Sequence, residues 1–239
     1  MTIGKVALIT GSSRGIGLEI AKTLYRNNYS VSLISRNKDE LQRSFGKSKN
    51  ALFIKCDVSS VDDIKSAVAQ TIKRFGRIDI LVNNAGVNLR TDFMHTTKEE
   101  WNEVINTNLT SVFFISQFVG NIMLKQKGGS IINISSVLGI KADSVSVQYG
   151  VSKGAIITLT KYLAKTFAPN ISVNCIAPGF VNTGWHSDKS PERIQSIIER
   201  IPMKRFAEPK EVAQLAFFLA SQGRYITGET IIMDGGYSL

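Results

Sequence analysis

The fold of this chain is decided close to its N-terminus, by the stretch Val6-Ala7-Leu8-Ile9-Thr10-Gly11-Ser12-Ser13-Arg14-Gly15-Ile16-Gly17. A short apolar run leads into a turn with three glycines, and apolar residues then recur at helical spacing through Leu24. A strand, a glycine-rich turn and a helix in this order are typical of dinucleotide binding. Gly11 permits the tight turn, Gly15 lets the backbone approach a pyrophosphate, and Gly17 lets the helix pack on the strand. The helix N-terminus offers free N–H groups and a positive dipole end to the phosphates.

The same alternation of strand and helix continues along the chain. Strand-like apolar runs fall at residues 5–10, 30–35, 51–56, 79–82, 130–135, 171–176 and 230–233, with helical segments between them. Such alternation predicts right-handed βαβ units and a parallel sheet covered on both faces. No linker or internal repeat divides the 239 residues, so we expect one α/β domain over residues 1–239.

Composition agrees with a globular protein of a reducing compartment. Apolar residues make up 43% of the chain, but no run of eighteen exists, which excludes a membrane span. The first strand begins by residue 5, so we expect no signal or transit peptide and a cytoplasmic location. The two cysteines, Cys56 and Cys175, lie in apolar strand-like surroundings, and each is interpreted as a small buried hydrophobic residue.

A second informative stretch is Tyr149-Gly150-Val151-Ser152-Lys153. Residues four apart lie side by side on a helix, so this spacing places a phenol next to an ammonium. A phenol with a pKa of about 10 needs about 4 kcal/mol of preferential phenolate stabilisation to reach a pKa of about 7. One ammonium about 4 Å away supplies that amount at an effective dielectric constant near 20. The pair is therefore a candidate proton donor with the charge that tunes it.

The glycine spacing G-x-x-x-G-x-G and the tyrosine–lysine pair do not stand alone. Further motifs follow at regular distances: Cys56-Asp57-Val58, Asn83-Asn84-Ala85-Gly86, Asn106-Thr107-Asn108-Leu109, Ile134-Ser135-Ser136, Ala177-Pro178-Gly179-Phe180-Val181, Ile226-Thr227-Gly228-Glu229 and Asp234-Gly235-Gly236. In this order they resemble the short-chain dehydrogenase/reductase family over essentially the whole chain. The chain looks most like the 3-oxoacyl-[acyl-carrier-protein] reductases and related carbonyl reductases of that family. The resemblance implies a Rossmann fold with a seven-stranded, doubly wound parallel sheet in the order 3-2-1-4-5-6-7.

The resemblance also implies the roles of four catalytic residues. Tyr149 is the general acid, and Lys153 lowers its pKa and bonds the nicotinamide ribose. Ser136 holds and polarises the substrate oxygen, with Ser135 as the rival hydroxyl on the opposite side of the strand. Asn108 anchors a water chain that returns a proton to Tyr149, and its alternative is a structural, helix-bending role.

The end of the second predicted strand indicates which nicotinamide cofactor is used. Residues 34–37 contain no acid that could bond a ribose 2′-hydroxyl, and Arg36 can bind a 2′-phosphate through its planar guanidinium group. The family resemblance implies that Arg14 points to the same place. We therefore expect NADP(H), and the alternative is that both arginines are solvated surface charges. In the related family, residues like Asp57 and Val58 lie near the adenine, and residues like Val181 and Thr183 hold the carboxamide. The full set of cofactor-binding residues predicted from the loop and the family motifs is Gly11, Ser12, Ser13, Arg14, Gly15, Ile16, Gly17, Arg36, Asp57, Val58, Asn84, Ala85, Gly86, Tyr149, Lys153, Pro178, Gly179, Val181 and Thr183. Asn83 is expected to be structural.

Two histidines, His95 and His186, are too few and too far apart for a metal site, so we expect none. His95 is interpreted as a surface residue near a helix capped by Thr97 or Thr96. In the related family, a segment like residues 182–206 is a lid over the substrate. Trp185 and Met203 are candidates to line an apolar pocket there, although packing against the rest of the protein is the commoner arrangement for both residue types. His186 follows Trp185 and is a candidate for the mouth of the pocket, without being the favoured interpretation.

The resemblance implies an NADPH-dependent reduction of a 3-oxoacyl thioester in fatty acid biosynthesis. Alternatives are a reductase of a free ketone, quinone, sugar or cyclic alcohol, and a non-catalytic NADP(H) sensor. The stretch before Tyr149 and the short segment 38–50 depart from many carrier-protein reductases.

The net charge is +10, and its basic residues are scattered without an aromatic platform, which argues against a nucleic-acid partner. Most of this charge is interpreted as solvated surface. The favoured alternative is that Lys125, Lys127 and Lys204-Arg205 at the rim of the site steer an acidic acyl-carrier protein or a CoA phosphate. A homotetramer is expected, formed through the strand at 230–233 with Ala213, Ala216, Phe217 and Leu219 of the preceding helix, and through the helices that carry Asn108 and Tyr149.

Overall fold

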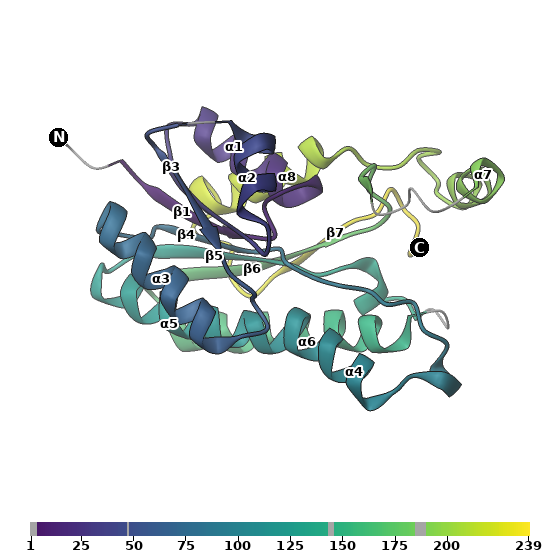
Figure 1. Cartoon of the computed structure of the whole chain (residues 1–239). Helices are drawn as coiled ribbons and strands as arrows, with labels where there is room; N and C mark the ends of the chain where they lie inside the picture. Colours follow the sequence, from purple (N-terminus) through teal and green to yellow (C-terminus); the bar gives the residue numbers. More distant parts are fainter. Residues whose placement is uncertain (1–3, 47, 143–145, 185–189) are drawn as a thin grey trace.

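A computed structural model describes residues 4–46, 48–142, 146–184 and 190–239. Its centre is a seven-stranded, entirely parallel sheet in the order β3-β2-β1-β4-β5-β6-β7 (Figure 1). The strands are β1 (Val6–Thr10), β2 (Ser30–Ser35), β3 (Ala51–Lys55), β4 (Ile80–Asn83), β5 (Gly129–Ile134), β6 (Ile171–Pro178) and β7 (Thr230–Met233). The predicted fold class and strand order are confirmed.

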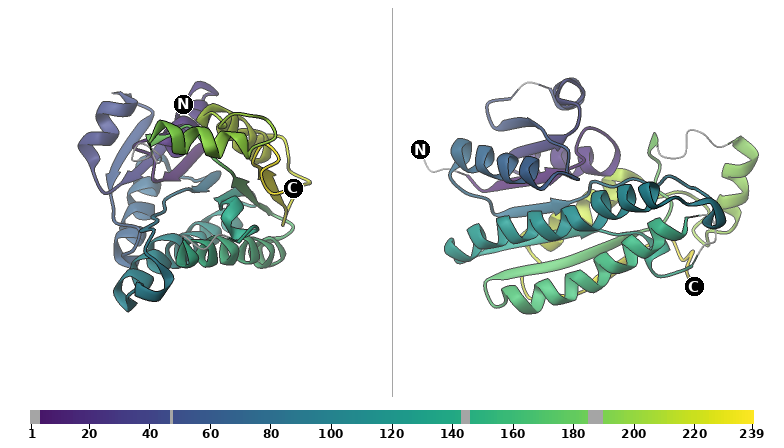
Figure 2. Two further views of the ribbon diagram at one scale, coloured as in Figure 1. Left: turned by 90° about the vertical axis from the view of Figure 1, so that its right-hand side faces the viewer. Right: turned by 60° about the horizontal axis from the view of Figure 1, so that its bottom comes forward.

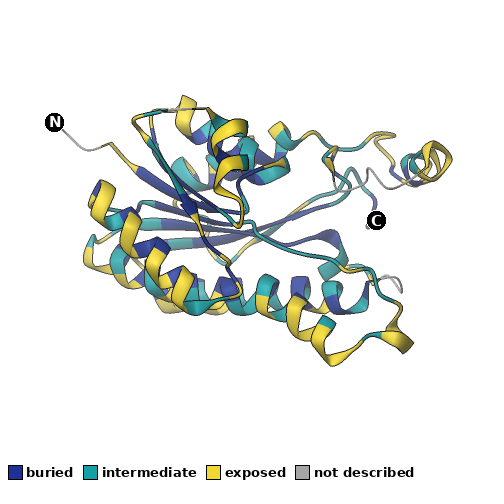
Figure 3. Cartoon of the chain, viewed as in Figure 1, coloured by how far each residue is buried: buried dark blue, intermediate teal, exposed yellow. Residues whose placement is uncertain are grey.

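Helices cover both faces of this sheet (Figures 1 and 2). One face carries α1 (Gly15–Arg26), α2 (Lys38–Phe45) and α8 (Pro209–Ser221). The other carries α3 (Val61–Phe75), α5 (Ser111–Lys125) and α6 (Val147–Phe167), with α4 (Lys98–Ile105) beside α6. The central strands are buried on both sides, while the outer helix faces are exposed (Figure 3). This is why the strands have continuous apolar sequences rather than alternating ones.

Two separate apolar cores result from this layering. On one side of the sheet, Ile20 and Leu24 of α1 pack with Val212 and Ala216 of α8. On the other side, residues of α3, α5 and α6 pack against the opposite faces of the same strands. Every residue of β1 is buried, which explains how one short strand can anchor both layers.

The course of the chain fixes where a ligand can bind. β1 pairs with β2 on one side and with β4 on the other, so the order of the strands reverses direction at β1. In an open parallel sheet, the crevice outside the carboxyl ends of the strands at this point is the usual ligand site. The loops that follow β1, β2, β4, β5 and β6 all meet at this edge. Beyond it lies α7 (Pro191–Glu199), at the right of Figure 1.

One sequence prediction about packing is wrong. Ala213, Ala216 and Leu219 of α8 were expected to meet a second copy of the chain, but all three are buried in this chain's own core. They pack against α1 and against strands β5 and β6 because they lie on the apolar face of the helix, which covers this part of the sheet. Phe217 is partly buried in the same core, and Phe218 is the aromatic residue of α8 that faces solvent.

Several smaller predictions are confirmed. Cys56 and Cys175 are both free and buried. Thr97 caps α4 and forms a capping box with Glu100, and the His95 side chain is 82% exposed beside Asp92. Trp185 and His186 lie outside the described residues. Among the helices that the structure describes, none is long and apolar enough to cross a bilayer.

Candidate active site

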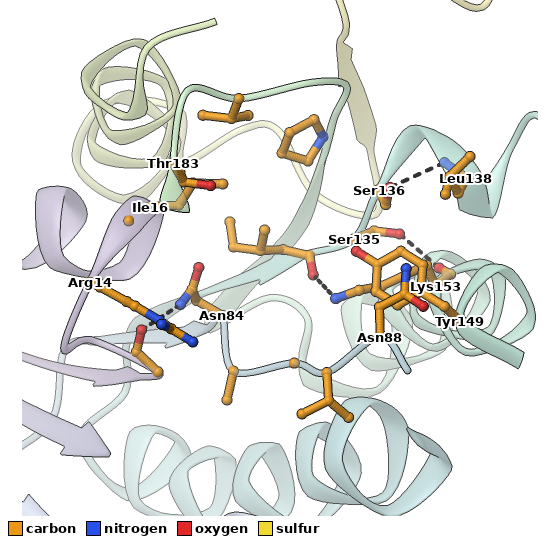
Figure 4. Close-up of a pocket in the computed structure, with 18 of the residues that line it drawn as sticks. Arg14, Ile16, Asn84, Asn88, Ser135, Ser136, Leu138, Tyr149, Lys153 and Thr183 are labelled. Carbon is orange, nitrogen blue, oxygen red and sulfur yellow. Dashed lines mark hydrogen bonds between the residues drawn. The ribbon is translucent and has the colours of Figure 1, made fainter. Parts of the chain in front are cut away.

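The loops at the carboxyl edge of the sheet enclose a cavity of about 420 Å³. It is lined by eighteen residues that the sequence singled out: Gly11, Ser13, Arg14, Gly15, Ile16, Arg36, Asp57, Val58, Asn84, Ala85, Gly86, Ser136, Tyr149, Lys153, Pro178, Gly179, Val181 and Thr183. Figure 4 shows Arg14, Ile16 and Thr183 on one side of this cavity, with Ser136, Tyr149 and Lys153 on the other. A ligand that fills it therefore extends from the glycine loop to the tyrosine.

Three predicted residues, Ser12, Gly17 and Asn108, do not line the cavity. The Ser12 hydroxyl is buried and donates to the carbonyls of Ile9 and Ile34, which ties the loop to the two strands. Gly17 lies inside the first turn of α1. A Cβ atom on Gly17 would collide with the Gly11 carbonyl oxygen and with the amide of Asn84. These residues shape the loop from behind.

Asn84 holds the glycine loop in place. Its Nδ2 donates to the carbonyl oxygens of Thr10 at 3.0 Å and Gly11 at 2.9 Å, and its backbone N–H donates to the Thr10 hydroxyl at 3.0 Å. The family resemblance implied a place near the nicotinamide ribose for Asn84 and also a bracing role for its motif at the central strand. The structure shows the bracing role, since this amide connects the end of β4 to the end of β1, and Asn84 also lines the cavity. Asn83 is structural as expected, because its amide donates to Asn133 at 2.8 Å and to Ser116 at 3.1 Å inside the protein.

The loop fits a pyrophosphate. Gly11 and Gly15 have φ angles of 62° and 57°, which disfavour residues with a Cβ atom and bring the backbone up to the cavity. The first turn of α1 contains no acidic residue, so its free N–H groups face an electropositive space.

Arg14 and Arg36 lie at this end of the cavity, and both are exposed. Within the described residues, neither guanidinium has a carboxylate partner, so both are available to a phosphate. Asp57 is the acid that lines the cavity here, and its Oδ1 accepts bonds from the backbone and the hydroxyl of Ser59.

The tyrosine and the serine meet at the opposite end. Ser136 follows β5 and is the N-cap of a short 3-10 turn, η3 (Val137–Gly139), where its Oγ accepts from the Leu138 N–H at 3.2 Å. η3 packs directly on α6, because a Cβ atom on Gly139 would lie 2.7 Å from the backbone nitrogen of Gly154. This close approach places Ser136 beside Tyr149 in the lining of the cavity, near enough for its hydroxyl to affect the pKa of the phenol. The rival Ser135 points elsewhere, donating to the Lys153 carbonyl at 2.7 Å.

Lys153 lies one turn after Tyr149 on α6, as its spacing predicts. Its Nζ is 5.5 Å from the centre of the Tyr149 ring and donates to the Ile134 carbonyl at 2.9 Å. The side chain is almost fully buried. Burial lowers the pKa of Lys153 to about 8, because an ammonium ion is poorly solvated there.

The predicted lowering of the Tyr149 pKa to about 7 is wrong for this structure. Burial raises the pKa of Tyr149 to about 12, and the hydrogen bond with Ser136 offsets only part of that rise. The reason is that removing a phenolate from water costs more than its surroundings return. The phenol is therefore fully protonated at neutral pH, which suits a proton donor.

Asn108 lies in a five-residue π-helical segment, η2 (Asn106–Thr110), between α4 and α5. Its amide is buried and connects two elements: Oδ1 accepts from the Val87 N–H at 2.8 Å, while Nδ2 donates to the Val87 carbonyl and the Ser152 hydroxyl, each at 3.0 Å. Both amide protons are thus used inside the protein. The side chain positions the loop after β4 against α6, and its role in a water chain stays a prediction.

The structure adds cavity residues that the sequence analysis missed. Four come from loops and the C-terminal turn: Arg90, Val137, Leu138 and Tyr237. Three come from one face of α7: Arg193, Ile197 and Arg200. Their spacing of four and three residues is the helical repeat, which would have identified the face. Met203, a candidate for the pocket, does not line it and is 63% exposed.

The predicted basic rim is also placed differently. Lys125 and Lys127 directly precede β5, so within one chain they lie at the amino edge of the sheet, far from the cavity. Lys204 donates to the Glu199 carbonyl, and Arg205 forms a two-pronged ion pair with Glu211. The arginines of α7 occupy the rim in their place.

Among the described residues, the cavity is lined by six basic side chains and one acid, Asp57. The basic side chains are Arg14, Arg36, Arg90, Lys153, Arg193 and Arg200. No group of three or more His, Cys, Asp or Glu side chains in the described part of the chain is arranged to hold a metal ion. The cavity therefore fits a polyanionic ligand.

The sheet is doubly wound, and a glycine-rich loop suited to phosphate lies at its switch point. Across the cavity from this loop lie a buried tyrosine, lysine and serine. This combination defines a nucleotide-dependent oxidoreductase. Comparison with known proteins specifies the family. The family model described as enoyl-(acyl carrier protein) reductase matches residues 11–238. The chain belongs to the short-chain dehydrogenase/reductase family and binds a nicotinamide cofactor.

Relatives agree over their full lengths. The chain is 41% identical to the 3-oxoacyl-[acyl-carrier-protein] reductase FabG of Thermotoga maritima, covering 98% of this chain and 97% of the relative. It is 38% identical to an acetoacetyl-CoA reductase of an Acinetobacter species, covering 99% and 98%. The solved structure of the aldohexose dehydrogenase of Thermoplasma acidophilum superposes with a TM-score of 0.89 at 32% identity, covering 98% and 94%.

Proposed function

We propose that this protein is an NADPH-dependent 3-oxoacyl thioester reductase, acting as a 3-oxoacyl-[acyl-carrier-protein] reductase in fatty acid biosynthesis. The observation that carries the proposal is the meeting of Tyr149, Ser136 and Lys153 at one end of a cavity whose other end is a phosphate site. The full-length likeness to reductases of 3-oxoacyl and acetoacetyl thioesters supports the substrate class. A cytoplasmic location and a single domain with residues 182–206 as its lid belong to the same proposal.

The cofactor is held from the loop to the tyrosine. The backbone of the glycine loop and the N-terminus of α1 bind the pyrophosphate, and Arg14 and Arg36 bind the 2′-phosphate. Val181 and Thr183 hold the carboxamide, and Lys153 bonds the nicotinamide ribose. When bound, the reduced nicotinamide supplies the hydride that reaches the carbonyl carbon.

Side chains of the protein bind and protonate the ketone oxygen of the substrate. Ser136 and Tyr149 both donate hydrogen bonds to the ketone oxygen, where negative charge develops during reduction. Tyr149 then transfers its proton to that oxygen, since a buried phenol is protonated at neutral pH. Asn108 bonds the loop after β4 to α6, the helix that carries Tyr149, and so holds these two elements in a fixed relative position.

Substrate range is tested with four compounds by following the absorbance of NADPH, which is consumed in the reductions and formed in the sugar oxidation. Acetoacetyl-CoA and a 3-oxoacyl-carrier protein test the proposal, and crotonyl-CoA tests reduction of a carbon–carbon double bond. An aldohexose with NADP⁺ tests the alternative that the structural likeness to an aldohexose dehydrogenase favours. We expect the two 3-oxo thioesters to have the highest kcat/KM values. A higher value for the sugar or for crotonyl-CoA contradicts the proposed substrate.

Cofactor choice is tested by Arg36→Asp. A charge-assisted bond to a phosphate contributes about 1.5–3 kcal/mol, so the KM for NADPH should rise by about ten- to a hundredfold. The KM for NADH should change little, because NADH has no 2′-phosphate. Arg43→Asp is the matched control, since Arg43 is exposed on α2 and does not line the cavity. A wild-type enzyme that prefers NADH contradicts the cofactor assignment.

A further inference from the structure

The arginines of α7 are not accounted for by the cofactor. Arg193, Ile197 and Arg200 share one face of the helix and line the cavity. Ile197 packs in an apolar cluster with Val137 and Tyr237, and Val137 directly follows Ser136. The two arginines therefore lie next to the substrate-binding end of the cavity, whereas Arg14 and Arg36 lie by the glycine loop.

Neither α7 guanidinium is engaged by an acid in the described residues. The neighbouring acids are occupied elsewhere: Glu192 bonds with Ser190 at the helix start, and Glu199 accepts from Gln195. Two unpaired guanidinium groups on one face of a short helix make an anion site. Arginine suits a phosphoryl group in particular, because its planar fork can form two parallel bonds.

Arg200 is held in place by the C-terminal turn. Its guanidinium lies 5.2 Å from the centre of the Tyr237 ring, within the range of a cation–π contact. Tyr237 is itself fixed: its ring is 6% exposed and lies 4.6 Å from the Lys141 Nζ, which also donates to the Tyr237 carbonyl. Asp234 closes this turn by accepting from the N–H groups of Gly236 and Ser238. Arg200 is thus positioned before any ligand arrives.

We propose that Arg193 and Arg200 bind a phosphoryl group on the thioester carrier of the substrate, remote from the ketone. The phosphate of a phosphopantetheine arm, which CoA and acyl-carrier proteins share, has the chemistry required. This inference rests on the proposed function, because only a thioester substrate brings such a phosphate into the cavity.

The test compares thioesters of one 3-oxoacyl group on carriers with and without phosphate. Acetoacetyl-CoA and acetoacetyl-4′-phosphopantetheine carry the phosphate, and acetoacetyl-N-acetylcysteamine lacks it. The test variant is the double substitution Arg193→Gln/Arg200→Gln. The control is Arg224→Gln, because Arg224 is exposed and lies outside the cavity. The ratio of kcat/KM for acetoacetyl-CoA to that for the neutral thioester should fall at least about tenfold, mainly through KM. The phosphopantetheine thioester should behave as acetoacetyl-CoA does.

Three outcomes overturn the inference. Equal losses on phosphorylated and neutral thioesters mean that α7 acts only structurally. A raised KM for NADPH means that the arginines contact the cofactor. A loss with acetoacetyl-CoA alone places the contact on its nucleotide. If the double variant does not fold, Arg193→Gln alone is used, and its ratio must fall in the same direction. Failure of the wild type to reduce any of the three thioesters contradicts the proposed function instead.

Discussion

At the scale of single residues, burial disfavours the charged forms of the tyrosine and the lysine at the catalytic end of the site. Burial raises the pKa of Tyr149 to about 12 and lowers the pKa of Lys153 to about 8. Both shifts have the same cause, since the charged form of each group loses water and gains few partners. A neutral phenol serves as an acid in ketone reduction. It is a poor base for the reverse reaction at neutral pH.

Replacing Tyr149 with phenylalanine removes the proton donor and leaves the phosphate contacts intact. General acid catalysis contributes about a hundred- to ten-thousandfold, so kcat with acetoacetyl-CoA should fall by at least about a hundredfold. The dissociation constant for NADPH, measured by fluorescence titration, should change little. Tyr162→Phe is the control, because Tyr162 lies on the same helix with 71% exposure. Retention of more than a few per cent of turnover in Tyr149→Phe would rule out Tyr149 as the acid.

Lys153 links stability to pH in the cofactor-free protein. Its pKa is about 8 in the folded chain against an ordinary value of 10.5. Below pH 8 the Lys153 side chain is protonated in both the folded and the unfolded chain, and the folded chain bears the full cost of the buried charge. Between pH 8 and 10.5 only the unfolded chain binds it, so stability rises with pH. The whole effect is about 3 kcal/mol, of which about 2 kcal/mol falls between pH 7 and 9.5.

The measurement is urea unfolding of the wild type and of Lys153→Met at pH 7 and pH 9.5. The free energy of unfolding of the wild type should rise relative to the variant by about 2 kcal/mol over this interval. Staying below pH 10 avoids the ionisation of tyrosines. A stability difference that is the same at both pH values would show that Lys153 keeps its ordinary pKa.

At the scale of elements, short loops after parallel strands position every part of the site. The glycine loop after β1 depends on Asn84 after β4, and Ser136 after β5 depends on the packing of η3 against α6. Each loop is thus fixed by a neighbour distant in sequence. A change behind the cavity should therefore act as strongly as one inside it.

Gly17→Ala tests this dependence. The added methyl group would collide with the Gly11 carbonyl and the Asn84 amide, neither of which can move without breaking the bonds between them. Overpacking of this kind costs about 1–3 kcal/mol, and the shifted loop should weaken NADPH binding at least about tenfold. Gly128→Ala is the control, because its methyl group would meet no atom within 4 Å. Thermal unfolding and NADPH titration measure both effects, and unchanged affinity in Gly17→Ala would contradict the packing argument.

The sequence predicted those elements whose signal is local. All seven strands were predicted within about two residues, because each is a continuous apolar run with a turn on either side. The glycine loop and the Tyr149/Lys153 spacing were likewise evident from the pattern. The π-helical segment at Asn106–Thr110 was not, since no composition distinguishes it from the α-helices on both sides.

The predictions that failed depend on long-range contacts. The pKa of Tyr149 reflects burial by several segments, which helical spacing cannot show. The particular bonds by which Asn84 braces the glycine loop could not be predicted from the sequence, because its partners lie more than seventy residues away. The positions of Lys125 and Lys127 followed from the topology of the sheet rather than from their charge.

At the scale of the whole molecule, exposed apolar residues lie at the open edge of the sheet and on two of the helices that cover it. β7 is the edge strand of the sheet, and Ile232 on it is 46% exposed. Ile140, equally exposed, lines a second cavity of about 290 Å³ together with Ile232 and Ile157. Phe113 of α5 and Val151 of α6 are also close to half exposed. An open edge strand beside apolar side chains favours pairing with another chain.

We predict a homotetramer built on two kinds of two-fold contact, one through β7 and one through α5 and α6. Self-complementary contacts of this kind close into dimers and tetramers rather than fibres. Light scattering at micromolar concentration should give about 105 kDa, four times the 26.3 kDa of one chain. Ile232→Glu places a charge in the β7 contact and should reduce the mass to about half. Met94→Glu is the control, because Met94 is 81% exposed on η1 (Phe93–His95), away from both contacts. A wild-type mass near that of one chain would refute the assembly, and a mass of two chains would leave only one of the two contacts.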